Sequence, residues 1–255
     1  MRVLLTLQYL GTRYAGWQCQ ENALAIQEVV EKALAKVFGV PVRIHSAGRT
    51  DTGVHAIAQR AHFDLPTPIP PRGLARGLNT ILPPDIRVTD AEEVPPDFHA
   101  RMSAVGKTYR YQIWNAEVAD VFLAPTWAHV AQPLDTDRMG EAAAALVGTH
   151  DFRSFTVAEP EVSSTVRRLD RITVARDGAR VIIETHGDGF LRNMVRRIAG
   201  HLIEIGRGKL GVDSIRRALE PEFAESRWTA PAEGLFLVDV EYGEARQKAE
   251  GRRQK

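Results

Sequence analysis

The order of apolar and polar residues predicts alternating strands and helices along most of the chain. Apolar residues at every second position predict strands, and an apolar stripe repeating every 3.6 residues predicts helices. The first part of the chain then has the order β-α-β-β-α-β. Its predicted strands are 2–10, 41–47, 57–65 and 86–94, and its predicted helices are 26–38 and 72–82.

The second part of the chain is predicted to repeat this order. Asp135 or Thr136 is suited to cap a helix that stops at Gly148, and Asp177–Gly178 favours a tight hairpin. Two such repeats predict an α+β fold of two ferredoxin-like α/β sandwich domains, each an antiparallel sheet with helices on one face. The predicted strands are 103–115, 127–130, 165–176, 179–187 and 234–242, and the predicted helices are 136–147, 190–205 and 212–219.

The strand 103–115 lies between the two repeats and predicts the domain boundary. We expect an N-terminal domain over 1–103, a C-terminal domain over 104–245 and a cleft at their junction. The segment 246–255 is polar, basic and without periodicity, so it is predicted to be a disordered tail.

Composition narrows the class of protein. Among 255 residues, 44% are apolar and 25% charged, which is typical of a soluble globular protein. No apolar run approaches membrane-spanning length, so we expect a cytoplasmic protein without a membrane partner. The single cysteine, Cys19, excludes an internal disulfide framework and gives no zinc signature.

The net charge of +1 conceals a strong local asymmetry. Residues 164–217 carry twelve Arg or Lys against six acids, and 27 of the 33 basic residues in the chain are arginine. An arginine-rich segment favours a polyanionic partner, because the guanidinium fork suits phosphate. The competing interpretation is a solvated structural face.

The stretch 45–56 carries the candidate chemistry. Gly48 and Gly53 bracket Arg49 and Asp51 just after a predicted strand, where a glycine-containing loop presents side chains. Asp51 is the predicted reactive group. A plain surface turn is the competing interpretation, since Gly, Asp and Thr are ordinary turn formers.

Two other enzyme classes share parts of this pattern. Asp51–Thr52–Gly53 is also the tripeptide of aspartic proteases, but those need two carboxylates and this chain has one copy. His55 and His62 lack companion ligands at zinc spacing, so no metal site is predicted. Without a phosphate loop or Gly-x-Gly-x-x-Gly, neither a nucleotide nor a redox cofactor is indicated.

A binding module without catalysis is a further alternative. Ferredoxin-like sheets with exposed aromatics can stack single-stranded RNA bases, and Tyr109, Tyr111 and Trp114 lie at suitable positions in one strand. Packing in the core is the competing interpretation for alternating aromatics.

Seven segments, taken in order, give the chain a resemblance to the tRNA pseudouridine synthase A family over residues 1 to about 242. Together they are highly specific, and the tail after Tyr242 lies outside the pattern. The segments are Tyr14–Gln18, Gly48–His55, Phe98–Arg101, Lys107–Tyr111, His150–Phe155, Gly189–Arg197 and Ala232–Leu235.

The resemblance implies two ferredoxin-like domains with the active site in the cleft, a homodimer, and conversion of uridine to pseudouridine at positions 38, 39 and 40 of the tRNA anticodon stem-loop. Asp51 matches the catalytic aspartate, Tyr109 the active-site tyrosine, and Arg196 the basic partner of the aspartate. Leu235 matches an apolar residue under the base, and Arg49 would contact RNA or hold the target nucleotide out of the stack.

The implied isomerisation needs neither redox equivalents nor ATP, which agrees with the missing cofactor motifs. Asp51 can act as a nucleophile or remove a proton from the sugar, and the sequence leaves both open. It also leaves open which tRNAs and uridines are preferred, what the tail does, and whether dimerisation is required for activity.

Overall fold

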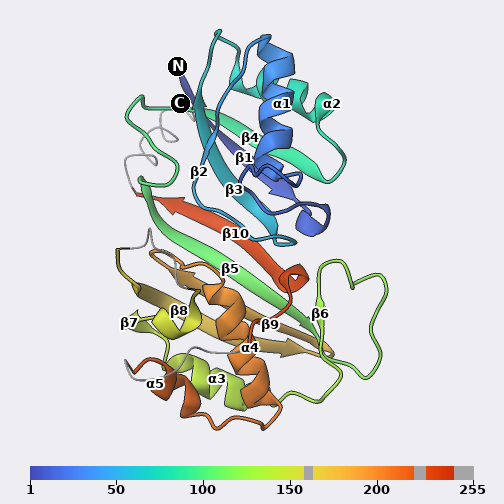
Figure 1. The fold of residues 1–255 in the computed structure, drawn as a ribbon, viewed down its shortest axis with the longest axis vertical. Coiled ribbons are helices and arrows are strands. Elements are labelled where there is room, and N and C mark those ends of the chain that lie inside the picture. The colour runs from blue at the N-terminus through green and yellow to red at the C-terminus, as the bar shows by residue number, and fades with distance from the viewer. Residues whose placement is uncertain (158–162, 221–227, 244–255) are drawn as a thin grey trace, which may run out of the picture. The chain divides into compact units, whose positions relative to one another are not determined.

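The computed structural model describes residues 1–157, 163–220 and 228–243, which form two compact units. The first contains Met1–Lys107 and the chain from Leu237 onward, and the second contains Thr108–Phe236. Each combines a β-sheet with a few helices (Figure 1). The sequence boundary at residue 103 is close to this division, but the last strand, predicted for the second domain, belongs mainly to the first unit.

The first unit has the element order β-α-β-β-α-β that the sequence predicts. Its sheet has the strand order β4-β1-β3-β10, and β2 pairs with β3. Strand β1 is antiparallel to both β3 and β4, with Leu5 opposite Ala61 on one side and Ala91 on the other. The elements are β1 (Arg2–Tyr9), α1 (Ile26–Phe38), β2 (His45–Ser46), β3 (His55–Asp64), α2 (Pro71–Ile81), β4 (Ile86–Val94) and β10 (Leu235–Tyr242).

The predicted strand 41–47 is largely wrong, because only β2 within it pairs as a strand. Pro41 has no N–H to give to a ladder. The backbone of Ile44 instead bonds to side chains of α1: its N–H donates to Glu31 at 3.1 Å, and its carbonyl accepts from Gln27 at 3.2 Å. Helix α1 thus takes the place of a neighbouring strand for this segment.

The helices of the first unit stop where the sequence predicts. Gly39 ends α1 in the left-handed conformation at φ 73°, with its N–H donating to the Ala35 carbonyl. Helix α2 begins with Pro71 and ends before Pro83, since proline fits a helix start and cannot continue a helix. In Figure 1 both helices lie beside the strands of this unit, and α2 packs against β4.

The second unit has a sheet in the order β5-β9-β8-β7, with β6 pairing β5. Strand β8 is antiparallel to β7 and β9, but β6 is parallel to β5, which differs from the predicted all-antiparallel sheet. The strand near 127–130 and the helix near 212–219 are confirmed as β6 and α5, but β7 was not predicted. It begins at Gly148, the predicted helix stop, whereas α3 ends at Ala144. The elements are β5 (Ala104–Trp114), β6 (Ala128–His129), α3 (Thr136–Ala144), β7 (Gly148–Asp151), β8 (Val166–Asp177), β9 (Arg180–Gly187), α4 (Met194–Gly206) and α5 (Ser214–Ala218).

Local signals in the second unit are confirmed in two places and corrected in a third. Asp135 caps α3 by accepting from the Arg138 N–H at 3.0 Å, and Gly178 turns the β8–β9 hairpin at φ 57°. The helix predicted from residue 190 begins only at Met194. Asn193, at φ 59°, interrupts the helical backbone just before it.

Two further predictions concern the C-terminal tail and membrane-spanning helices. The predicted disordered tail, 246–255, lies outside the described residues. Within the described part of the chain, no helix is both long and apolar enough to span a bilayer.

Candidate active site

The loop that carries Asp51 spans residues 47–54, between β2 and β3, and is called the Asp51 loop below. Asp51 is half-buried and Arg49 exposed. The Trp17 N–H donates to the Thr50 carbonyl at 3.0 Å, and the Val54 N–H donates to the Asp51 carbonyl at 3.1 Å. The loop presents side chains, as predicted, on a hydrogen-bonded backbone.

Glycine is required where the chain passes close beside this loop. Gly16 has φ 83°, and a Cβ there would lie 2.5 Å from the Thr50 carbonyl oxygen and 3.1 Å from the Asp51 carbonyl carbon. Both the backbone conformation and the contact exclude larger residues. The turn at Gly16 therefore sets the position of the Thr50–Asp51 peptide.

Side chains from three strands hold the same loop. The Tyr9 hydroxyl is hydrogen bonded to the Thr50 hydroxyl at 2.8 Å, Gln59 Nε2 donates to the Gly48 carbonyl at 2.9 Å, and Lys107 Nζ donates to the Ala47 carbonyl at 2.9 Å. Sequence reasoning missed all three supporting residues. Lys107 lies within one of the family segments, whereas Tyr9 and Gln59 looked like ordinary strand residues.

His55 closes the loop and has a structural role. It is fully buried, and its Nδ1 accepts from the Gly11 N–H at 2.9 Å. A buried imidazole that accepts a backbone hydrogen bond is part of the fold.

The other three predicted site residues lie in the second unit. Tyr109 is buried and packs edge-on against Phe190, with ring centroids 4.8 Å apart. Arg196, in the first turn of α4, donates from Nε to the Ala230 carbonyl at 2.8 Å and from Nη1 to Asn193 Oδ1 at 3.3 Å. Leu235 is buried at the start of β10.

The segment before Leu235 is fixed by Tyr111. The Tyr111 hydroxyl donates to the Pro231 carbonyl at 2.8 Å, and a Cβ on Gly234 would lie 2.8 Å from the Tyr111 ring. Burial raises the pKa of Tyr111 well above its ordinary value; the charge of Glu233 raises it further and that of Arg196 opposes it. Arg196, Tyr111 and the 230–235 segment are thereby parts of one local arrangement.

Asp51 and Arg49 thus lie in the first unit, and Tyr109, Arg196 and Leu235 lie in the second. Each unit positions its own residues through the contacts above. The pairing of Asp51 with Arg196 that the family resemblance implies stays a prediction.

Comparison with known proteins decides the class. A family model described as tRNA pseudouridine synthase matches residues 6–103 and 142–243. The chain belongs to this family. Proteins named tRNA pseudouridine synthase A are similar over 94% of this chain and 99% of their own length: 45% identical in Geotalea uraniireducens, 43% in Pelobacter propionicus and 44% in Geobacter sulfurreducens.

A solved structure, the archaeal box H/ACA sRNP Nop10–Cbf5 complex, aligns with 81% of this chain at 11% identity and a TM-score of 0.35. The aligned part spans 44% of that longer chain. A likeness of this size supports no further conclusion.

Membership of the tRNA pseudouridine synthase family removes the aspartic-protease interpretation of Asp51–Thr52–Gly53. The structure also weakens the aromatic stacking surface. Tyr111 is fully buried, Tyr109 is 7% exposed and Trp114 is half-buried, so two of the three aromatics pack in the interior. Core packing, the competing interpretation, holds for both tyrosines.

The arginine-rich segment of this synthase is partly neutralised within its own unit. Arg168 pairs with Asp170 at 3.1 Å, and Arg171 pairs with Glu184 at 3.5 Å. Glu204 pairs with Arg207 at 2.6 Å and with Lys209 at 3.4 Å. The segment keeps its formal excess of six positive charges, but a part of it serves the fold rather than a partner.

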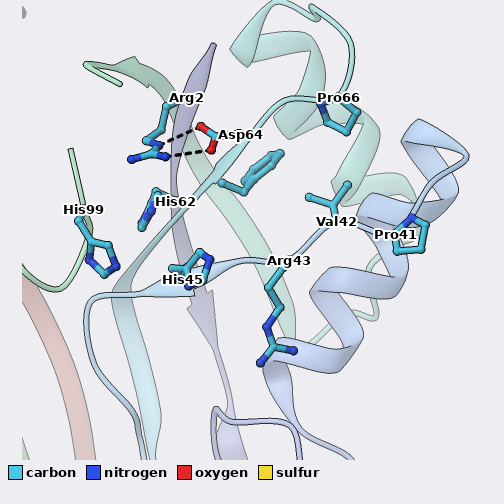
Figure 2. A pocket seen from close by; sticks show the side chains of 10 residues that line it. Arg2, Pro41, Val42, Arg43, His45, His62, Asp64, Pro66 and His99 are labelled. Atoms are coloured by element: carbon cyan, nitrogen blue, oxygen red, sulfur yellow. Dashed lines mark hydrogen bonds and ion pairs between the residues drawn. The ribbon is translucent and has the colours of Figure 1, made fainter. Parts of the chain in front are cut away.

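The pocket in Figure 2 has a volume of about 450 Å³ and lies in the first unit. Arg2 makes a two-pronged ion pair with Asp64 at 2.9 Å, drawn as dashed lines in Figure 2, and Arg43 lies 3.4 Å from Glu31. Three histidines complete the lining. None of the predicted site residues is among its lining residues, which are Arg2, Pro41, Val42, Arg43, His45, His62, Phe63, Asp64, Pro66 and His99.

Two histidines of this pocket have lowered pKa values, which favours their neutral forms. Burial, with the nearby charges of His99 and Arg2, lowers the pKa of His62 to about 4, and burial lowers that of His99. His62 Nδ1 accepts from the Ala100 N–H at 3.1 Å. With both arginines beside carboxylates, this pocket does not have the charge of a phosphate site. Over the described ranges, no group of three or more His, Cys, Asp or Glu could hold a metal ion.

Proposed function

We propose that the protein converts uridine to pseudouridine at positions 38, 39 and 40 of the tRNA anticodon stem-loop, with Asp51 as the catalytic group. The near-complete alignment with proteins named tRNA pseudouridine synthase A carries this proposal. The hydrogen-bonded loop supports it from the structure, because a reactive side chain needs a fixed position.

The reaction breaks the N1–C1′ glycosidic bond of uridine, turns the uracil and joins C5 to C1′. C5 then loses its hydrogen to solvent, and N1 gains a proton. The carboxylate of Asp51 supplies an anionic oxygen that attacks the sugar or the base, or removes a proton from the sugar. The reaction is an isomerisation, balanced without an oxidant, a reductant or a nucleotide.

The target uridine lies inside a stem and must be flipped out, at a cost of a few kcal/mol. We assign Tyr109 and Leu235 to the walls that receive the base. This assignment rests on the family resemblance and not on exposure, since both side chains are buried in the second unit. Arg49, exposed two residues before Asp51, is assigned to the nucleotide backbone. Arg196 is assigned as the cationic partner of Asp51.

The proposal includes an architecture. Two ferredoxin-like domains enclose the active site in a cleft, and two copies of the chain form a homodimer. The β-α-β-β-α-β order of the first unit supports the first of these domains. No cofactor is required.

The decisive experiment measures tritium released from tRNA labelled at uridine C5. We expect Asp51→Asn to release no label above background, while its tRNA affinity stays within about tenfold of the wild type. Asparagine keeps the size and hydrogen-bonding capacity of the loop residue but not the anionic oxygen. Asp90→Asn, at an exposed position of β4, is the matched control and should behave as wild type.

Release by Asp51→Asn within tenfold of the wild type would show that another group is catalytic. Mapping pseudouridine in bulk tRNA after incubation with the wild type tests the reaction itself. A protein that only binds RNA would leave the tRNA unchanged.

A further inference from the structure

The residue that precedes Asp51 is fixed on both its side chain and its backbone. Thr50 is 6% exposed; its hydroxyl is hydrogen bonded to the Tyr9 hydroxyl at 2.8 Å, and its carbonyl accepts from the Trp17 N–H at 3.0 Å. A rotation of the Thr50 backbone would carry Asp51 with it. Such a rotation must break one of these two hydrogen bonds.

Tyr9 is suited to hold Thr50 and unsuited to touch RNA. It lies on β1 and is 3% exposed, and its hydroxyl is hydrogen bonded to Thr50 of the Asp51 loop. Burial raises the pKa of Tyr9 to about 12, so the phenol stays neutral and keeps its proton over the working range of pH. Gln59 Nε2 also donates to this hydroxyl, in a long hydrogen bond of 3.5 Å.

We propose that Tyr9 is a positioning residue, whose buried hydroxyl acts through Thr50 to hold the Asp51 carboxylate in its reactive place. This inference rests on the proposed function, since it assumes that Asp51 is the catalytic group. It predicts that the loss of one buried hydroxyl lowers turnover although Tyr9 never touches the substrate. A displacement of about 1 Å at a catalytic group can cost a hundredfold in rate.

The chain offers a matched control in Tyr14. Tyr14 is also 3% exposed, and its hydroxyl also makes a 2.8 Å hydrogen bond, but to Asp85. Tyr9→Phe and Tyr14→Phe therefore remove the same group from side chains of equal exposure, although the Tyr9 bond is buried and the Tyr14 bond part-buried. Tritium release under saturating and limiting tRNA gives kcat and KM for each variant, and thermal unfolding gives Tm.

We expect Tyr9→Phe to lower kcat about tenfold with KM within about twofold, and Tyr14→Phe to keep both within about twofold. A rise in KM without a fall in kcat, an equal fall in kcat in both variants, or an unchanged kcat in Tyr9→Phe would overturn the proposal. If Tm shifts equally in the two variants, a difference in kcat between them reports positioning and not general stability.

Thr50 provides the second arm, which decides the question if Tyr9→Phe does not fold. Thr50→Val removes the hydroxyl at nearly constant shape, and Thr50→Ser retains it. We expect Thr50→Val to match Tyr9→Phe and Thr50→Ser to recover most of the wild-type kcat. In the Tyr9→Phe/Thr50→Val double variant the losses should not multiply, because both changes remove the same hydrogen bond.

Failure of this inference differs from failure of the proposed function. If the wild type releases no tritium, the proposed reaction is wrong. If the wild type is active, Asp51→Asn is inactive and Tyr9→Phe is unimpaired, only the positioning role is wrong.

Discussion

The two units fix their candidate residues by different means. In the first, two neutral side chains, Tyr9 and Gln59, and the ammonium of Lys107 hold the Asp51 loop, and Gly16 passes close beside it. In the second, arginines donate to carbonyls: Arg196 to Ala230 at 2.8 Å and Arg197 to Thr156 at 2.8 Å. A mostly neutral support responds more to shape than to salt, whereas an arginine support also adds positive charge beside the candidate residues.

The largest effect should come from a change of shape in the first unit. Gly16→Ala forces an L-residue to φ 83° and a Cβ to 2.5 Å from the Thr50 oxygen. We expect about 3 kcal/mol less free energy of unfolding, from denaturant titration, and at least about a hundredfold loss of kcat at a temperature where the variant is folded.

Gly77→Ala is the control for this prediction. Gly77 lies inside α2, and a Cβ added there would meet nothing within 4 Å, so alanine should preserve activity and add up to about 1 kcal/mol of stability. Normal turnover in folded Gly16→Ala would show that the Asp51 loop tolerates displacement, and the contrast between the units would be lost.

The second expected effect is a loss of stability at acid pH, and it occurs in both units. Burial lowers the pKa of His62 in the first unit and of His201 in the second to about 4, from an ordinary value of 6.5. Between pH 6.5 and 4 the unfolded chain binds more protons at these residues, so stability falls as pH falls through that window. We expect each histidine to lower the free energy of unfolding by about 2.5 kcal/mol when the pH falls from 7.5 to 4.5.

Urea unfolding at the two pH values measures this loss. His201→Gln keeps a group able to bond Ser214, which lies 2.9 Å from His201 Nε2, and His62→Asn keeps an acceptor for the Ala100 N–H. Each variant should show a flatter pH dependence. The control, His129→Gln at an exposed position, should keep the wild-type pH dependence of the free energy of unfolding. If His62→Asn and His201→Gln also keep it, other groups cause the loss of stability in acid.

Arg196 tests the arginine support of the second unit. Arg196→Lys keeps the charge but cannot reproduce the bonds to both Ala230 and Asn193. We expect kcat for tritium release to fall about tenfold, or about 1.4 kcal/mol in the barrier. Arg216→Lys, exposed on α5, should be neutral. If Arg196→Lys is fully active, charge alone is sufficient at this position.

Much of the fold could be predicted because its signals are local. Gly39 after α1, Asp135 before α3 and Asp177–Gly178 between β8 and β9 each act within one turn of chain. The failures lie where distant residues decide. Glu31 and Gln27 of α1 take the hydrogen bonds of the predicted strand at Ile44, and no pattern within 41–47 records that.

The candidate site shows the same division. The glycines around Asp51 mark a loop that presents a side chain, and the structure agrees. Of the supporting residues, Tyr9 and Lys107 come from strands distant in sequence, and Gln59 from the strand that follows the loop. Alternation alone cannot distinguish a buried tyrosine that bonds a loop from one that fills the core. Their role depends on pairing and register.

The smallest effect concerns the surface charge of the second unit. Arg167 donates to the Ser164 carbonyl at 2.9 Å, and Arg168, with its side chain 57% exposed, pairs with Asp170. An arginine already bound to the fold releases fewer counterions from RNA than a fully solvated one. We expect Arg167→Gln/Arg168→Gln to raise the Kd for tRNA less than about tenfold at 0.1 M salt, and kcat at saturating tRNA to stay within about twofold.

Filter binding over a salt series measures this change as a slope. For the wild type, log affinity should fall by several units per log unit of salt. For the double variant, this slope should be smaller by at most about two units. Arg72→Gln/Arg76→Gln, which removes two exposed arginines from α2 in the first unit, is the matched control and should leave the slope unchanged. Equal losses in the two double variants would mean that RNA contacts are shared between the units. The distinction between a mostly neutral support in the first unit and an arginine support in the second would then apply to how each unit holds its own residues, and not to where the tRNA backbone lies.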